Sequence, residues 1–230
     1  MTAPVSVIIP TLNVADRIGP CLGALGEALF DGLIREVILA DGGSADAIED
    51  VADAIGARLV TGRPGRGIQL GAGAEAATGA WFLFLHADTV LGEDWAQAVR
   101  GHINSHGDKA AYFRLQFKSD HWAARPVAGW ANLRARVFGL PFGDQGLLVS
   151  RTAYRAAGGY PDMPLMEDVA LARRLQRGIR FRALAAIAET SADRYEARGW
   201  LRHGVANLWR QVRYFTGTPP ENLASRYPRS

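Results

Sequence analysis

The sequence has a single cysteine, and this scarcity excludes two kinds of site. Cys21 cannot form an internal disulfide and cannot supply a cysteine-based zinc site. A metal ion would therefore have to bind oxygen or histidine ligands. Little cysteine is also typical of a reducing compartment, so we expect a cytoplasmic location. Cys21 itself lies in an apolar helical pattern and is predicted to pack in the core.

Long apolar runs are also missing. No stretch approaches 18 uninterrupted apolar residues, which disfavours a membrane-spanning helix. The N-terminal segment, MTAPVSVIIPTLN, lacks the basic region and the cleavage site of a secretory signal. With 48% hydrophobic and 21% charged residues in 230 positions, the composition is that of a folded globular chain of about one domain.

Charge is distributed unevenly along the chain. Residues 1–169 hold 14 basic and 19 acidic side chains (net −5), whereas residues 170–230 hold 12 basic and 4 acidic side chains (net +8). A basic C-terminal segment indicates an anionic partner. By charge alone, nucleic acid and anionic lipid both qualify.

Short apolar runs alternate with helical patterns over the first hundred residues. The runs predict buried strands at 5–9, 36–40, 57–61 and 80–85. Helical patterns follow them over 15–29, over 45–55 with Ser44 as the expected cap, up to about residue 77, and over 93–104. This alternation predicts a mainly parallel sheet flanked by helices, with ligands bound at the carboxyl ends of the strands.

After residue 104 the alternation becomes irregular. The pattern indicates strands at 110–118 and 147–150, and helices at 125–138 and 167–177. The two single histidines in the second half, His121 and His203, have no partner at metal-ligand spacing, and we expect both at the surface.

The C-terminal part predicts a helical extension. We expect a catalytic domain over residues 1–197 and the extension with its tail over residues 198–230. An amphipathic helix is indicated by apolar residues at helical spacing, namely Leu201, Val205, Leu208, Trp209 and Val212. Its apolar side either packs on the domain or lies in the headgroup region of an anionic membrane.

Polar clusters follow three of the predicted strands, at 10–13, 41–44 and 86–89. Asp88 is suited to hold a divalent cation against a diphosphate, since Mg²⁺ and Mn²⁺ prefer oxygen ligands. It could equally cap the next helix or close a turn. Asp41 has two comparable interpretations: it binds a ribose or a base, or it belongs to an ordinary Asp-Gly-Gly-Ser turn.

Two further segments carry charged groups suited to chemistry. Arg66, between two glycines, could bind a diphosphate by paired hydrogen bonds or be a solvated loop arginine. Its segment lacks the glycine spacing of a dinucleotide fingerprint and the Lys-Ser/Thr of a phosphate loop. Glu167 and Asp168 open a predicted helix beside an apolar loop. They either complement the helix dipole, or include a desolvated carboxylate that acts as a general base.

Taken in this order, the motifs resemble those of the inverting glycosyltransferases of family 2, which have the GT-A fold. The resemblance covers residues 4–182 and rests on SVIIPTLN (6–13), DGGS (41–44), GRG (65–67), FLHADT (84–89), GDQG (143–146) and Glu167-Asp168. FLHADT, GDQG and PLMED are similar, more narrowly, to a bacterial subgroup of short transferases associated with radical-SAM or selenium domains. The resemblance implies a Rossmann-like α/β domain that transfers a sugar from a nucleotide-diphosphate sugar to an acceptor.

The resemblance implies roles on the nucleotide side of the site. Pro10, Thr11 and Asn13 would line the nucleotide pocket. Asp41 would bind the base or the ribose, and Arg66 would approach the nucleotide.

The resemblance also implies roles on the reacting side. Asp88 matches the last aspartate of the family's Asp-x-Asp motif, which is expected to reach a Mn²⁺ or Mg²⁺ cofactor, and His86 replaces the first aspartate. Asp168 would be the catalytic base, with Glu167 beside it. The acceptor and donor-sugar side would be bordered by Gly143, Asp144 and Gln145.

The residue chemistry agrees with an inverting transfer, which needs a base and a cation but no covalent nucleophile. A lipid-linked acceptor, and a place on the inner face of the membrane, would explain the C-terminal helix. No nucleic acid is expected, and an oligomer remains open. Because His86 replaces the first aspartate of the metal motif, an alternative function stays open: a non-catalytic nucleotide-sugar-binding module recruited to a membrane. A nucleotidyltransferase would need a basic glycine-rich loop where this chain has PTLNVADR.

Overall fold

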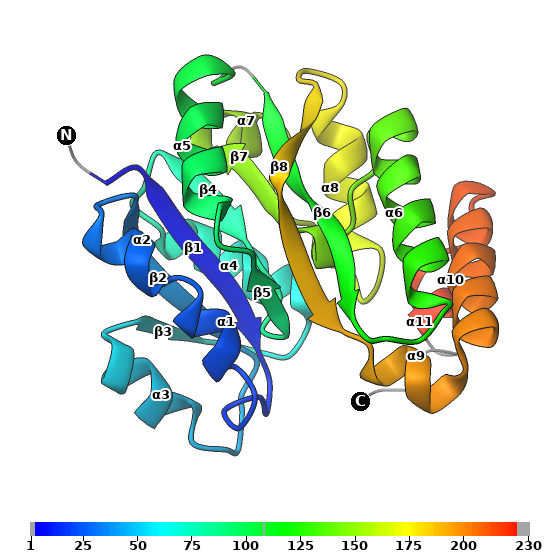
Figure 1. The fold of residues 1–230 in the computed structure, drawn as a ribbon, viewed down its shortest axis with the longest axis horizontal. Helices are drawn as coiled ribbons and strands as arrows, with labels where there is room; N and C mark the ends of the chain where they lie inside the picture. Colours follow the sequence, from blue (N-terminus) through cyan, green and yellow to red (C-terminus); the bar gives the residue numbers. More distant parts are fainter. Residues whose placement is uncertain (1–2, 108, 225–230) are drawn as a thin grey trace.

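The structure, a computed structural model, describes residues 3–107 and 109–224 (Figure 1). Within them, one mixed sheet of eight strands runs in the order β3-β2-β1-β4-β7-β6-β8-β5. Parallel pairing joins β1 (Val5–Thr11), β2 (Ile34–Asp41), β3 (Arg58–Thr61) and β4 (Trp81–Phe84). The other strands are β5 (Thr89–Leu91), β6 (Ala110–Lys118), β7 (Leu147–Ser150) and β8 (Phe181–Ser191).

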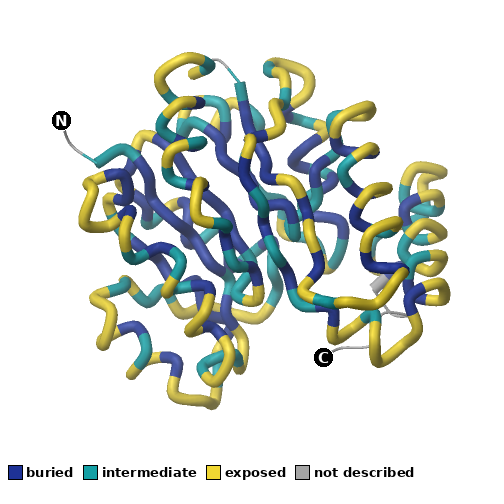
Figure 2. The backbone as a smooth tube through the Cα atoms, viewed as in Figure 1, coloured by how far each residue is buried: buried dark blue, intermediate teal, exposed yellow. Residues whose placement is uncertain are grey.

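Helices cover both faces of the sheet, and the strands between them are the most buried part of the chain (Figures 1 and 2). One face packs against α1 (Gly19–Gly23), α2 (Gly26–Phe30), α3 (Ile48–Ile55) and α5 (Trp95–Ser105). The opposite face packs against α4 (Arg66–Ala76), α7 (Arg151–Ala156) and α8 (Glu167–Leu175). Successive β1 residues serve the two faces in turn: Val7 and Ile9 belong to the first core cluster and Ile8 to the second.

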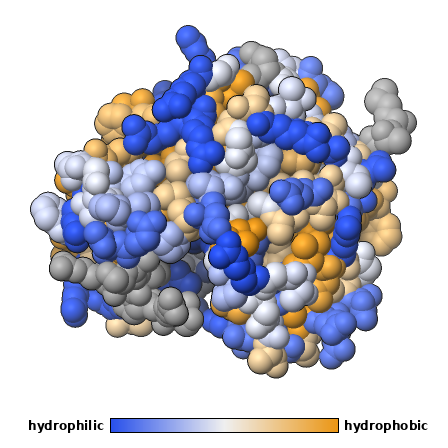
Figure 3. All heavy atoms as spheres, turned by 180° about the vertical axis from the view of Figure 1, so that it is seen from behind, coloured by the Kyte–Doolittle hydropathy of each residue, from blue (hydrophilic) through white to orange (hydrophobic). Residues whose placement is uncertain are grey.

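A further group of helices stands beside β6 and β8 (Figure 1). It comprises α6 (Ala124–Phe138), α9 (Asp193–Arg198), α10 (Trp200–Phe215) and α11 (Pro220–Ala224). A short 3₁₀ turn at Gly143–Gln145 leads into β7. Seen from behind, the molecule carries hydrophilic side chains with apolar ones in separate patches between them (Figure 3).

The predicted parallel strands are confirmed, and the sheet as a whole is more mixed than expected. Antiparallel pairing occurs between β4 and β7, β6 and β7, and β5 and β8, whereas β6 and β8 are parallel. The sequence analysis missed β5, β8 and the short helices α7 and α9. In β8 the buried positions alternate at Leu184, Ala186 and Ala188, and the alanines there give little hydrophobic contrast.

Two local predictions are wrong. The single helix expected over 15–29 is a turn followed by α1 and α2, because Pro20 opens α1 and the glycines at 23 and 26 interrupt the helical pattern. Ser44 does not cap the helix that follows it. That helix begins at Ile48, after Ala47, and the Ser44 hydroxyl instead bonds to Asp41.

Candidate active site

The ends of β1 and β2 lie side by side and are joined through a buried carboxylate. Asp41, which pairs with Thr11 in the sheet register, is 3% exposed. One of its oxygens accepts hydrogen bonds from the hydroxyls of Thr11 (3.0 Å) and Ser44 (2.5 Å), and the other accepts from the backbone N–H groups of Gly43 and Ser44 (2.8 Å each). Burial raises the pKa of Asp41, but these hydrogen bonds outweigh it and hold the pKa below its usual value.

The loop after β1 is fixed onto the loop after β2. Asn13 has a left-handed backbone (φ 51°), its N–H donates to the Ser44 hydroxyl (2.8 Å), and its side-chain oxygen accepts from the N–H of Ala45 (2.9 Å). Asparagine adopts this conformation more readily than most non-glycine residues, because its short side chain can bond locally, and these two hydrogen bonds fix it there. Pro10 lies half-buried within β1, opposite Ala40.

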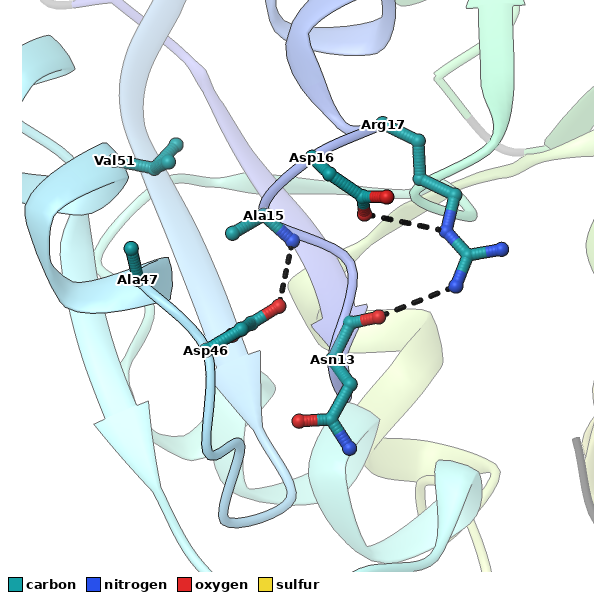
Figure 4. Close-up of a pocket in the computed structure, with 7 residues that line it drawn as sticks. All are labelled: Asn13, Ala15, Asp16, Arg17, Asp46, Ala47 and Val51. Carbon is teal, nitrogen blue, oxygen red and sulfur yellow. Dashed lines mark hydrogen bonds and ion pairs between the residues drawn. The ribbon is translucent and has the colours of Figure 1, made fainter.

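A hollow of about 530 Å³ opens beside this loop (Figure 4). Its walls come from the segment after β1 and from the start of α3, namely Asn13, Ala15, Asp16, Arg17, Asp46, Ala47 and Val51. The Asp46 carboxylate accepts from the N–H of Ala15 (2.8 Å), and Arg17 donates to the backbone oxygen of Asn13 (3.2 Å). Of these residues, the sequence analysis singled out only Asn13.

The side chain of Gln69, in α4, links the ends of β1 and β2 to the loop before α4. This residue was not predicted from the sequence. Its side chain is buried, and its amide nitrogen donates to the backbone oxygens of Thr11 (2.7 Å) and Ala40 (2.9 Å). Its side-chain oxygen accepts from the N–H of Gly65 (3.2 Å). The polar residue on an otherwise small and apolar helix was the available signal. Gln69 therefore sets where Arg66 begins α4 relative to β1 and β2.

Arg66 starts α4 and forms an ion pair with Glu167, the first residue of α8. The Glu167 side chain is 2% exposed and that of Arg66 is 36% exposed. Gly67 allows the two helices to approach this closely, because a Cβ there would meet the backbone oxygen of Pro161 at 2.5 Å. The solvated loop arginine considered for Arg66 is thus not what the structure shows.

Asp168 sits next to Glu167 but faces different neighbours. One carboxylate oxygen accepts from the N–H of Gly143 (2.9 Å) and the other accepts from the N–H of Val169 (2.8 Å). The preceding residue, Met166, has a left-handed backbone (φ 66°). A carboxylate has about four lone-pair positions, so Asp168 keeps capacity to accept a proton from a further hydroxyl.

His86 joins the end of β4 to the same region. A Cβ on Gly143 would meet the His86 Nε2 atom at 2.4 Å, so only glycine lets the imidazole lie against this turn. Tyr160 and Leu70 line a small cavity with His86 and Gly143. Burial, together with the positive charges of Arg66 and Arg194, lowers the pKa of His86 to about 3, so the ring is neutral at pH 7.

The other residues of the GDQG motif have contrasting surroundings. Burial, reinforced by the charges of Asp168 and Asp88 and opposed by those of Arg134 and Arg66, raises the pKa of Asp144 to about 6. Its Oδ1 atom is buried without a hydrogen-bond partner among the described residues. Gln145 is fully buried, and its amide bonds to the backbone of Phe142 and Phe113 and to the Asn132 side chain. Asp144 thus keeps polar capacity inside the site, whereas Gln145 supports it from within the core.

Asp88 is exposed in the turn between β4 and β5, where the N–H of Thr89 donates to the His86 oxygen (3.1 Å). It does not cap the next helix, which begins at Trp95 after Asp94. Within residues 3–107 and 109–224, no three His, Cys, Asp or Glu side chains form a group that could hold a metal. The single exposed carboxylate of Asp88 is nevertheless compatible with Mg²⁺ or Mn²⁺, because such ions bind through one or two carboxylates together with substrate phosphates and waters.

The family model for glycosyl transferase family 2 matches residues 6–156, which include the ends of β1, β2 and β4 and the GDQG turn. The chain belongs to glycosyltransferase family 2. Among curated relatives, a PGL/p-HBAD biosynthesis glycosyltransferase of Mycobacterium bovis is 38% identical over 115 residues, 46% of this chain and 44% of that protein. A glucosyl-3-phosphoglycerate synthase of Mycolicibacterium paratuberculosis is 35% identical over 95 residues, 37% of this chain and 29% of the relative. The chain therefore matches less than half the length of these relatives.

Solved structures share the fold of this family 2 chain. The glucosyl-3-phosphoglycerate synthase from Mycobacterium tuberculosis, in complex with Mn²⁺, UDP and phosphoglyceric acid, has a TM-score of 0.58 at 22% identity, over 82% of this chain and 69% of that one. S. aureus TarS in complex with UDP has a TM-score of 0.63 at 17% identity, over 84% and 62% of the two chains. The expected GT-A-like α/β fold is confirmed.

The candidate site of this family 2 chain thus consists of two neighbouring groups near the carboxyl ends of β1, β2 and β4. Thr11, Asn13 and Asp41 form one group with the hollow beside them. The second group is built around the Gly143 turn and contains Arg66, His86, Asp144, Glu167 and Asp168. Gln69, which holds the Gly65 N–H, links the two. These residues lie at or just after the ends of β1, β2 and β4, in the first turns of α4 and α8, and in the 3₁₀ turn before β7.

Proposed function

We propose that this chain transfers a sugar from a nucleotide-diphosphate sugar to an acceptor hydroxyl, with inversion at the sugar carbon. The observation that carries the proposal is the orientation of Asp168. Its carboxylate is held by the Gly143 N–H at 2.9 Å, beside the strand ends that in this family hold the nucleotide. Asp168 acts as the base that takes the proton of the attacking hydroxyl.

The other residues bind and orient the donor. The hollow lined by Asn13, Ala15 and Arg17 receives the nucleobase. Asp41 binds the nucleobase or the ribose by exchanging a hydrogen bond from the Thr11 or Ser44 hydroxyl for one from the ligand. Pro10 and Thr11, at the end of β1, belong to the same nucleotide side of the site. Glu167 holds the Arg66 guanidinium through its Nε atom, and Arg66 reaches the diphosphate from that position. Gly143 and Asp144 border the sugar, while Gln145 positions their turn from the core.

We also propose that a divalent Mn²⁺ or Mg²⁺ binds at Asp88. The proposal is supported by the Mn²⁺ and Mg²⁺ complexes of the glucosyl-3-phosphoglycerate synthase, whose fold this chain shares. When bound, such a cation neutralises the charge that develops on the leaving diphosphate. His86, neutral and pressed against Gly143, replaces a second carboxylate and leaves Asp88 as the principal protein ligand.

Donor hydrolysis without acceptor tests this function. We expect the protein, incubated with a panel of nucleotide-diphosphate sugars and Mn²⁺, to release free nucleoside diphosphate from at least one. Asp88→Ala and chelation by EDTA should each reduce this release. If the protein binds a nucleotide sugar but releases no diphosphate from any donor, the chain is the non-catalytic binding module instead. Full turnover by Asp88→Ala in EDTA would contradict the metal proposal.

We further propose a lipid-linked acceptor and a cytoplasmic protein held at the inner membrane surface. No helix within the described residues is long and apolar enough to cross a bilayer. The proposal is supported by the basic C-terminal segment and by the exposed side of α10. The subgroup associated with radical-SAM or selenium domains, and the boundary near residue 198, stay predictions.

A further inference from the structure

Helix α10 turns its apolar side outward. The residues it buries are Trp200, His203 and Gln211. The predicted apolar stripe is exposed instead, with Leu201 at 68%, Val205 at 66%, Leu208 at 44%, Trp209 at 62% and Val212 at 42%. The first interpretation from the sequence, a stripe packed on the domain, is therefore wrong. The expectation of a surface His203 is also wrong, because His203 packs on the Tyr195 ring, with 4.5 Å between ring centroids.

Helix α6 has the same inverted character. It buries the alanines at 124, 128, 131 and 135, and it exposes Trp130 (48%), Leu133 (51%), Val137 (61%) and Phe138 (59%). The two helices are neighbours, because Trp200 at the start of α10 belongs to one core cluster with Ala128 and Ala131 of α6. Figure 1 shows both at the same end of the molecule. Exposed apolar residues on adjacent helices indicate an interaction surface.

The charges of these two helices have one sign. Neither α6 nor α10 contains an aspartate or a glutamate. Outside the core they carry Arg125, Arg136, Arg202, Arg210 and Arg213. Aromatic and aliphatic side chains interspersed with arginines are the pattern of a helix that lies in the interface of an anionic membrane.

We propose that α6 and α10 together form a face that docks on an anionic lipid bilayer. A symmetric dimer through this face would bring together two surfaces whose helices both carry arginines and no acidic residue, and this repulsion disfavours a second copy as the occupant. Helix α10 contacts the segment that carries the candidate base. Tyr214 of α10 packs in one cluster with Met166 and Val169, which flank Glu167 and Asp168 in the sequence. Resting on the proposed function, docking therefore brings the base close to an acceptor carried by the bilayer.

Vesicle flotation with matched variants tests the face. We expect the full chain to float with vesicles containing phosphatidylglycerol at low salt, and to stay unbound with pure phosphatidylcholine. Trp209→Glu on α10 and Leu133→Glu on α6 should each lower the vesicle partition coefficient about tenfold, because each loses an apolar anchor and adds a repelled charge. Phe30→Glu, which changes a 95% exposed residue of α2, is the control and should float like the unchanged protein.

Thermal unfolding checks that all three variants fold, and donor hydrolysis without vesicles should be unaltered in each. Absence of flotation of the unchanged protein at low salt would overturn the proposal. So would flotation of both glutamate variants to the same extent as the unchanged protein. So would a dimer in solution that Trp209→Glu dissociates, since the face would then be a self-interface. Failure of the unchanged protein to hydrolyse any donor would count against the proposed function and leave the docking result standing.

Discussion

Asp168 and Glu167 are neighbours in the chain, yet the first turn of α8 gives them different tasks. Glu167 points into the protein and pairs with Arg66, whereas Asp168 accepts hydrogen bonds only from the backbone N–H groups of Gly143 and Val169 among the described residues. A carboxylate already committed to a guanidinium is a poor proton acceptor. At the scale of single residues, we therefore assign the base to Asp168 and the positioning of Arg66 to Glu167.

Replacing the two acids separately distinguishes these roles. Asp168→Asn should reduce transfer on the order of 10² to 10⁴-fold, the usual contribution of a general base, with donor affinity nearly unchanged. Glu167→Gln keeps the shape but weakens the hold on Arg66, so it should change donor KM more than kcat. Steady-state kinetics and nucleotide binding measure both. Normal turnover by Asp168→Asn would move the base elsewhere.

Asp144 gives a pH-dependent prediction. Its pKa of about 6 in the folded protein lies above the ordinary value of 3.8, so the folded state resists its ionisation. The stability cost is absent at low pH, grows as pH rises from about 4 to 6, and is complete above that range. Asp144→Asn should therefore stabilise the protein at pH 8 by on the order of 1–3 kcal/mol, and by much less at pH 4.5.

Urea unfolding in EDTA at the two pH values measures this difference. Asp46→Asn is a matched control, since Asp46 is an exposed carboxylate in the hollow beside the loop after β1. If Asp144→Asn raises the free energy of unfolding equally at both pH values, the burial of a charged Asp144 is not the cause of the gain in stability.

At the scale of elements, the site depends on how closely α4 meets the segment before α8. Gly67 lies at this contact, where an added Cβ would meet the Pro161 oxygen at 2.5 Å and the Glu167 Cβ at 3.1 Å. One turn later the same helix has more room, because a Cβ on Gly71 would have the Tyr160 oxygen as its nearest neighbour at 4.0 Å. The close approach is therefore local to the Arg66–Glu167 pair.

A pair of glycine variants tests this packing. Gly67→Ala should destabilise the protein by about 1–3 kcal/mol, as overpacking does, and should weaken donor binding by separating Arg66 from Glu167. Gly71→Ala should leave binding intact and stabilise the helix by up to about 1 kcal/mol, because alanine loses less backbone entropy. Thermal unfolding and nucleotide titration measure the two effects. Equal behaviour of the variants would contradict the proposed contact.

At the scale of the whole molecule, the candidate site and the proposed membrane face lie in different parts of the fold. The strand ends and the starts of α4 and α8 carry the site, and α6 with α10 carries the apolar, arginine-rich face. The C-terminal helices connect them, since Leu223 of α11 and Tyr214 of α10 share a cluster with Met166. Helices α10 and α11 thus pack against Met166 and Val169, which flank Glu167 and Asp168 in the chain.

A ligand that binds this folded arrangement should raise its stability. A nucleoside diphosphate with Mn²⁺ at 100 times its Kd should stabilise the protein by about 2.7 kcal/mol, which is several degrees in Tm for a chain of this size. Thermal shift measurements across the common bases, with Mn²⁺ or EDTA, would identify the base and the metal contribution together. No shift with any nucleoside diphosphate would contradict the proposed donor class.

Local sequence was enough to predict the strands that carry much of the candidate site. Strands β1, β2 and β4 were predictable from their apolar runs, and so were the polar residues that follow them. Strand burial and turn chemistry depend on neighbouring residues. For the same reason the starts of α6 and α8 were found within a residue or two. Four of the six family motifs lie in these segments, so the resemblance could be recognised from the sequence by itself.

The tertiary structure decided what each of these groups contacts. Arg66 pairs with a residue 101 positions away, and Gln69 bonds to one 58 positions away, so no local pattern could reveal either contact. The alternation in β8 became meaningful only when β6 and β5 supplied its neighbours. The amphipathic pattern of α10 specified a helix with an apolar side, but which side is buried depends on what the rest of the fold presents to it. Tyr195 and the alanines of α6 pack against Trp200, and this contact turns the apolar stripe outward.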